Sequence, residues 1–367
     1  MIFILTLFVL FLFFLFAPET VFLAAKTSLS LWAGTVVPSL LPFFILNRLL
    51  LTGGGIALFG KAMEKPVRFL LKLPGEAAFP LIAGYSCGVP VSATIIADLR
   101  KEKIISKSQG NRLLAFCANV SPAFLLSAVA ISMLDAGYIG PWLAMIHYGS
   151  NLLFTFIAAQ VYNKKEPAER NEHPNPKIPK GSISELTTDA IFHSIRTVCF
   201  VGGTMLIFFI IIAFFETIGF IPLISKLLHL SQTTSAVVSE LCCGLLEITT
   251  GTANTASAAL PLHLKCTLIS GILAFGGLSA AVQIKSTIRE TDLSLRFYFF
   301  YKAIQAVFAL SITVFFKLPE KTSAVFATIS SATPDTIGSC PILYWCTAGW
   351  IMLLIFRRLY SEGHRRY

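Results

Sequence analysis

The sequence predicts an all-α polytopic membrane protein with about eight transmembrane helices and two re-entrant hairpins, arranged in two inverted-topology repeats. The first observation behind this prediction is composition, because 55% of the 367 residues are hydrophobic and 13% are charged. A soluble globular chain carries roughly a quarter charged residues. The second is that apolar runs of about 20 residues, long enough to cross a bilayer, recur along the chain. The third is that Lys and Arg gather in alternate connecting segments, as they do in cytoplasmic loops.

The N-terminal segment 1–26 predicts the first transmembrane span. Residues 2–17 are almost wholly apolar, and the apolar run resumes at 21–25 after Pro18 and Glu19. A secretory signal peptide is the competing interpretation. It fits less well because the start lacks a basic region and the polar flank is a poor cleavage site.

Seven further apolar runs predict the remaining spans. They lie near residues 29–51, 113–133, 138–162, 196–218, 264–284, 297–317 and 341–357. The Pro-rich, charged stretch 163–195 is typical of a flexible linker. It separates a first repeat, 27–162, from a second, 196–317. We expect an extracytoplasmic loop at 318–340, and a last span with a basic cytoplasmic tail at 341–367.

Two apolar stretches, 77–98 and 235–260, are interrupted in the middle by Gly, Pro and polar residues. Broken backbone at membrane depth is tolerated where it is buried in protein or lines a cavity, because lipid cannot satisfy the freed amide groups. We therefore interpret both stretches as re-entrant helical hairpins. Two full spans kinked at Gly and Pro are the alternative.

The distribution of basic residues predicts the orientation. With a cytoplasmic N-terminus and two re-entrant hairpins, most of the 29 Lys and Arg residues fall on the inside, among them Lys285, Arg289, Arg296 and Lys302. Both termini are then cytoplasmic, and the two hairpins enter from opposite faces. An inverted repeat of this kind is the plan of many secondary transporters, whose substrates bind near the bilayer midplane.

The chain shows no constellation of catalytic residues. It lacks the H-E-x-x-H, G-x-S-x-G and P-loop patterns, and its eight cysteines are scattered without a C-x-x-C pair. We therefore expect neither an enzyme nor a bound metal or cofactor. The net charge of +10 reflects membrane orientation, so we expect no nucleic-acid partner.

The tip of the first hairpin, GYSCGVPVS at 84–92, is a candidate binding element. Gly84 and Gly88 allow close backbone approach, while Ser86 and Ser92 supply hydroxyl groups. Amide groups at the exposed N-terminus of a broken helix favour an anion. A kink needed for packing alone remains the alternative.

Glu247 lies at the break of the second hairpin, in CGLLEITTG (243–251), followed by Thr249 and Thr250. Ionisable groups inside a membrane are costly and usually face a cavity. We interpret Glu247 as a site of proton or ion coupling, with a carboxylate that caps a broken helix as the alternative. Thr249 and Thr250 are candidate substrate ligands.

Polar residues in the next span of each half complete the candidate site. They are Asn119 and Ser121 in FCANVSP, and Gln283 in AFGGLSAAVQ. Small residues at such positions also mark close helix packing, so a structural role stays open. His147 and Asn151 share a helix face, and either could instead bond a neighbouring backbone.

Seven motifs in order resemble the YlbJ family of sporulation integral membrane proteins, which belongs to the group with nucleoside-recognition Gate domains. They are VPSLLPFFIL (37–46), GYSCGVP (84–90), ADLRKEKIIS (97–106), FCANVSPAFL (116–125), HYGSN (147–151), LLEITTG (245–251) and AFGGLSAAVQ (274–283). The resemblance implies export of dipicolinic acid from the mother cell during endospore formation. It places the protein in the cell membrane or the outer forespore membrane.

The resemblance, and not the composition, implies dipicolinate as the small anionic substrate. Two other functions stay open. A nucleoside or cation carrier agrees with the Gate-domain group and with Glu247 as a cation ligand. A membrane scaffold for sporulation that transports nothing has no need of polar breaks inside the membrane.

Overall fold

The computed structural model describes residues 2–50, 52–53, 56–161, 182–227, 229–316 and 318–319. All regular structure in these residues is helical, which confirms the all-α class. The expected last span at 341–357, most of the loop at 318–340 and the first part of the linker at 163–195 lie outside the described residues.

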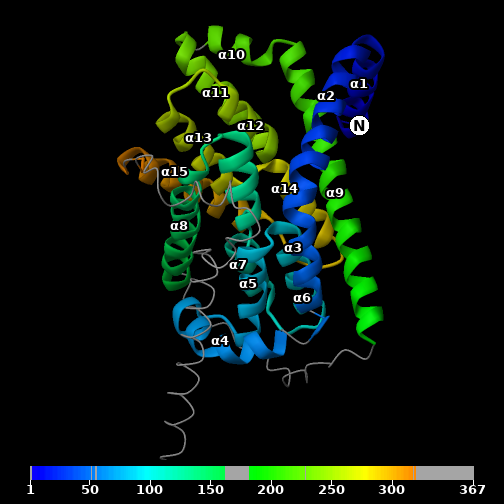
Figure 1. The fold of residues 1–367 in the computed structure, drawn as a ribbon, viewed down its shortest axis with the longest axis vertical. Helices are drawn as coiled ribbons and strands as arrows, with labels where there is room; N and C mark the ends of the chain where they lie inside the picture. Colours follow the sequence, from blue (N-terminus) through cyan, green and yellow to red (C-terminus); the bar gives the residue numbers. More distant parts are fainter. Residues whose placement is uncertain are drawn as a thin grey trace, which may run out of the picture. The chain divides into compact units, whose positions relative to one another are not determined.

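The helices vary widely in length (Figure 1). The α-helices are α1 (Ile2–Phe16), α2 (Pro18–Leu31), α3 (Val37–Leu50), α4 (Ile56–Leu71), α5 (Ala78–Ser86), α6 (Val89–Lys101), α7 (Lys107–Phe116), α8 (Gly140–Val161), α9 (Ile183–Thr217), α10 (Phe220–Leu227), α11 (Gln232–Leu246), α12 (Ile248–Ser257), α13 (Leu262–Phe275), α14 (Gly277–Thr287) and α15 (Arg296–Phe315). Two π-helical stretches, η1 (Trp32–Val36) and η4 (Phe124–Met133), and two 3₁₀ turns, η3 (Gly75–Ala77) and η5 (Gly137–Ile139), complete the set.

Five segments of the described chain are long and apolar enough to cross a membrane. They are Pro18–Leu50, Gly137–Gln160, Ile183–Thr217, Leu262–Thr287 and Arg296–Phe315. The apolar helices Leu7–Phe16 and Phe124–Met133 are shorter. These segments establish an integral membrane protein that crosses the bilayer several times.

The first helix boundary differs from the one expected. We expected a break between residues 25 and 29, whereas α2, η1 and α3 run on from Pro18 to Leu50 and the break lies at Ala17. Pro18 occupies the first turn of α2, where its missing N–H costs no hydrogen bond. α1 therefore packs as a separate helix against α2 and α9.

Part of the stretch expected to be linker is helical. α9 begins at Ile183, because Ser182 and Glu185 form a capping box in which each side chain accepts from the other residue's backbone N–H. A further helix, α4, lies between the expected span at 29–51 and the first hairpin. Its Phe69 is 80% exposed, and α4 and α10 lie at opposite ends of the bundle (Figure 1).

Among the described residues, four helical segments are interrupted, two more than expected. Each predicted hairpin is a pair of helices that pack on one another, α5 with α6 and α11 with α12. The expected single span at 113–133 is instead α7 and η4, separated by residues 117–121. The expected span at 264–284 is α13 and α14, which meet at Gly276, where φ is +85°.

The two halves of the chain pack reciprocally. α6 of the first hairpin contacts α14, and α12 of the second hairpin contacts η4. In the same way α7 contacts α15 while α13 contacts α8, and α3 packs along α9. Each interrupted segment is therefore held by elements of the opposite half.

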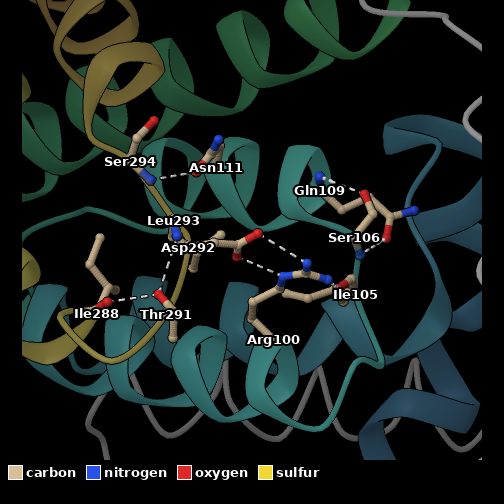
Figure 2. A network of polar contacts seen from close by, with 10 residues as sticks. All are labelled: Arg100, Ile105, Ser106, Gln109, Asn111, Ile288, Thr291, Asp292, Leu293 and Ser294. Carbon is tan, nitrogen blue, oxygen red and sulfur yellow. Dashed lines mark hydrogen bonds and ion pairs between the residues drawn. The ribbon is translucent and has the colours of Figure 1, made fainter.

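A polar network ties the α6–α7 turn to the segment between α14 and α15 (Figure 2). Arg100 donates from Nε and Nη2 to the two oxygens of Asp292 at 2.9 and 3.1 Å, and from Nη1 to the carbonyl of Ile105. Lys101 contacts Glu290 at 2.7 Å. These bonds from Arg100 and Lys101 lower the pKa values of the Asp292 and Glu290 carboxyls.

Candidate functional site

The four interruptions converge on one cavity of about 100 Å³. Its lining includes Gly88 from the first hairpin, Asn119 from the break after α7, Glu247 from the second hairpin and Gly276 between α13 and α14. Interrupted helices expose backbone groups that must be satisfied by protein, water or ligand. A cavity at their meeting point is therefore the candidate functional site.

The first hairpin contributes a helix N-terminus without a side-chain cap. Gly88 precedes α6 with φ +84° and ψ −162°, a conformation that side chains oppose. A Cβ on Gly88 would lie 2.9 Å from the carbonyl oxygen of Asn119. The hairpin tip therefore fits against the break after α7 because this residue is glycine. The positive end of α6 faces the cavity through Gly88, Val89 and Pro90.

The second hairpin contributes a helix N-terminus that is already occupied. Glu247 caps α12, and its Oε2 accepts from the Thr250 amide at 2.6 Å and from the Thr250 hydroxyl at 2.8 Å. Its side chain is buried and lines the cavity, as does Thr249. Glu247 therefore caps α12, which is the alternative role considered for it above. Its side chain also forms part of the cavity wall.

The break after α7 contributes an amide and a hydroxyl group. Asn119 donates from Nδ2 to the carbonyl of Phe116 at 3.2 Å, while its buried Oδ1 has no hydrogen-bond partner within the described residues. Ser121 accepts from the Phe124 amide at 3.2 Å and so caps the start of η4. Asn119 therefore lines the candidate site and has an acceptor without a partner among the described residues.

Gln283 of α14 reaches the cavity from the other half. Its Nε2 donates to Thr204 Oγ1 of α9 at 2.8 Å, and both side chains are buried. Sequence reasoning did not include Thr204, since a single hydroxyl in a long apolar helix gives little signal.

Four predicted site residues lie outside the cavity lining. Gly84 packs against the backbone of Cys117, where a Cβ would collide with the Cys117 carbonyl. Ser86 donates to Ile82 O at 2.8 Å, and Ser92 donates to Gly88 O at 3.2 Å. The hydroxyl and amide of Thr250 both bond Glu247. These four residues shape the hairpins that carry the lining residues.

Lys302 corrects the charge-based interpretation of the sequence. We counted it among the inside loops, whereas it lies in α15 and is fully buried. Its Nζ donates to Gln305 Oε1 at 2.9 Å, and Asn151 Nδ2 donates to the same oxygen at 3.3 Å. Tyr85 of the first hairpin donates to Asn151 Oδ1. A signal was present in the sequence, since Lys302 stands within the apolar run 297–317.

A second, more polar cavity of about 240 Å³ lies between α3, α6 and α9. Its lining includes Arg48, Asp98 and His193, and Arg48 pairs with Asp189 at 3.3 Å. Phe44 lines both cavities. The central cavity therefore lies next to a second cavity that is lined by charged side chains.

The described residues contain no group of three His, Cys, Asp or Glu side chains arranged to hold a metal ion. Their cysteines are free thiols. The polar groups around the central cavity are amides, hydroxyls, one carboxylate and helix ends, which suit recognition of a polar organic molecule.

Comparison with known proteins assigns the family. A family model named Gate and described as nucleoside recognition matches residues 33–137, which include the first hairpin and the break after α7. The sporulation integral membrane protein YlbJ of Bacillus subtilis (strain 168) is 30% identical in an alignment of 311 residues, which covers 80% of this chain and 76% of that protein. No solved structure matches the chain. The chain therefore belongs to the YlbJ family of sporulation integral membrane proteins, within the nucleoside-recognition Gate group.

Proposed function

We propose that this protein is a membrane carrier for a small carboxylate, with dipicolinate as its substrate in endospore formation. The observation that carries the proposal is the convergence of four helix interruptions on one cavity. A membrane scaffold gains nothing from breaking four helices at one depth, because each break frees backbone groups that must be satisfied again. Carriers use such breaks to hold substrate.

The proposed architecture is a pair of inverted repeats that alternate access to the cavity. The reciprocal packing supports it, since α6 contacts α14 as α12 contacts η4. The hairpin helices also lie toward opposite ends, with α6 toward the α4 end and α11 toward the α10 end (Figure 1). The basic segments of the sequence favour cytoplasmic termini.

In the proposed binding mode, one substrate carboxylate lies at the N-terminus of α6. That helix end carries a positive dipole and has no side-chain cap. Asn119, Ser121, Thr249 and Gln283 then contact the rest of the molecule, while Gly84, Ser86, Ser92 and Thr250 hold the hairpins in place. Glu247 is the proposed proton-coupling group, because it is a buried carboxylate in the cavity wall.

Flux of labelled dipicolinate into proteoliposomes tests the proposal. We expect saturable flux for the wild type, a loss for Asn119→Ala, and flux without pH dependence for Glu247→Gln. Glu185→Gln is the matched control, because Glu185 is an exposed carboxylate that also caps a helix start. Absence of flux from folded protein under a supplied pH gradient would contradict the proposal.

A nucleoside carrier is the second candidate, and the Gate match over residues 33–137 favours it. The same liposomes separate the two functions. Strong competition by uridine or adenosine, or strict dependence on sodium, would assign the cavity to nucleosides. Competition by other pyridine carboxylates and not by nucleosides would retain the carboxylate assignment.

A further inference from the structure

The polar cluster around Lys302 contains more hydrogen-bond donors than acceptors. The Lys302 ammonium has three N–H groups, and its hydrogen bond runs to Gln305 Oε1. No carboxylate forms an ion pair with Lys302 in the part of the chain that the structure describes. A buried ammonium without a counter-charge is costly in a membrane protein, so it usually serves a function.

Neighbouring side chains add to the shortage of acceptors. Gln305 Nε2 has no partner, and neither ring nitrogen of His147 has one among the described residues. All three side chains are buried, and His147 lies on α8 one turn before Asn151, which donates to Gln305. A neutral imidazole has one N–H donor and one acceptor nitrogen, so the unpaired donors of the cluster are N–H groups of Lys302, Gln305 and His147. Because each unpaired buried donor costs free energy, a carboxylate, which only accepts hydrogen bonds, suits the cluster.

Two tyrosines connect this cluster to the wall of the central cavity. Tyr85 donates to Asn151 of the cluster and packs its ring on Tyr148, with 5.7 Å between the ring centroids, beside the break whose residues Ala118 and Asn119 line the cavity. Tyr148 of α8 donates to the carbonyl of Val120 in the same break at 2.8 Å. The break after α7 is therefore the partition between the cavity and the cluster.

The cavity itself offers a dianion one vacant positive position. The N-terminus of α6 has no side-chain cap, but the N-terminus of α12 is filled by the carboxylate of Glu247. A molecule with two carboxylates therefore needs a second cationic partner. Lys302 is a fully buried amine that can take up a proton, and it has no carboxylate partner among the described residues.

We propose that Lys302, together with His147 and Gln305, forms a second carboxylate subsite behind the break after α7. This inference rests on the proposed function as a carboxylate carrier. A dicarboxylate places one group at α6 and the other at Lys302, once the partition at Asn119 moves aside. The subsite thus gives the carrier its preference for two carboxylates over one.

Equilibrium binding to the full-length protein in detergent micelles tests the subsite, with dipicolinate and picolinate as probes. Picolinate has one carboxylate and so uses the α6 position alone. We expect the wild type to prefer dipicolinate by about tenfold to a hundredfold, the range for one charge-assisted hydrogen-bonded contact. In Lys302→Met the preference falls to about one while picolinate binds as before. Lys285→Met removes an exposed lysine from α14 and should retain the preference.

A preference that persists in folded Lys302→Met would overturn the inference. So would an equal loss of both probes, which indicates a structural defect. If Lys302→Met does not fold, His147→Phe reports the same ratio, because it removes one donor and keeps the ring. If the wild type binds neither probe, the proposed function fails together with the subsite. If it binds both equally, the subsite alone fails.

Discussion

The two hairpin tips meet the same cavity but carry opposite electrostatic features. At the first tip, Gly88 leads into α6, whose N-terminus has no side-chain cap. At the second tip, Glu247 leads into α12 and places its own carboxylate on the amide of Thr250. Both helix ends carry a partial positive charge. In α12 a charge of the protein neutralises it, whereas in α6 it remains available to a ligand.

This difference shows how two similar helix breaks present unlike groups to one cavity. Two equivalent breaks would bind an anion equally well at both ends, and nothing would then fix the ligand's orientation. Glu247 occupies one of the two positions with its own carboxyl group. We therefore expect an anion in this cavity to lie at the N-terminus of α6 and not at that of α12.

Substitution of two glycines that lie against backbone atoms should have the largest effect on stability. These glycines also show that the two hairpins are packed differently. A Cβ on Gly251 would collide with Gly244 within the second hairpin, while one on Gly84 would collide with the Cys117 carbonyl outside the first. Because backbone cannot yield cheaply, we expect Gly251→Ala and Gly84→Ala each to destabilise the protein by about 3 kcal/mol or more. Thermal unfolding in detergent measures this.

Gly149→Ala is the matched control for these glycines. No heavy atom lies within 4 Å of a Cβ built at Gly149 in the middle of α8, so alanine there should be neutral or slightly stabilising. Equal melting temperatures for Gly149→Ala and Gly251→Ala would show that the second hairpin is not closed by backbone contact.

Substitution of Glu247 makes the second tip resemble the first and has an intermediate effect. Glu247→Ala removes the acceptor for the Thr250 amide, so we expect a loss of about 0.5–2 kcal/mol in unfolding free energy. Glu247→Gln keeps an acceptor oxygen and should lose less. Ser231→Ala removes the exposed cap of α11 and serves as a control for an ordinary cap. If the Gln and Ala variants were equally stable, Glu247 would not act as a cap.

The sequence predicted the hairpin breaks because Gly, Pro and Glu interrupt apolar runs there. It also marked Asn119 and Ser121 as a polar notch, but the surrounding span still appeared continuous. The break at Gly276 escaped prediction because two positive φ values leave no trace in hydropathy. A pattern of side chains reports periodicity, whereas backbone conformation at a glycine depends on tertiary packing.

Lys302 shows a second limit of sequence reasoning. Prediction of membrane orientation from basic residues assumes that each of them lies in water. A buried lysine near the end of an apolar run is then counted as a loop residue by mistake. Its hydrogen-bond partner Gln305 lies one helical turn away, but Asn151 and Tyr85, which extend the network, lie on other helices. Contacts of such long sequence separation depend on the fold and are not encoded in local spacing.

Substitutions at the C-terminal ends of α6 and α12 should have the smallest effect on stability. The two hairpins differ here as well. The C-terminal end of α6 is held by the Arg100–Asp292 ion pair, and that of α12 by a bond from Lys265 to the carbonyl of Ala256 at 2.7 Å. Arg100 lowers the pKa of Asp292 below its value in the unfolded chain. The stabilisation is therefore complete above the unfolded pKa of about 3.9 and is lost as pH falls through the lower folded pKa.

Comparison of Asp292→Asn with the wild type by thermal unfolding from pH 7 to pH 3 tests whether this stabilisation is lost on acidification. Because Asp292 is half-exposed, solvent screens the pair, and the wild type should be more stable by no more than about 1 kcal/mol. That advantage should be constant between pH 7 and about pH 5 and shrink toward pH 3. The bond to Ala256 ends on a carbonyl that does not titrate, so the deficit of Lys265→Met should stay the same across this range. A wild-type advantage that grew on acidification would mean that Arg100 does not stabilise the ionised carboxylate of Asp292.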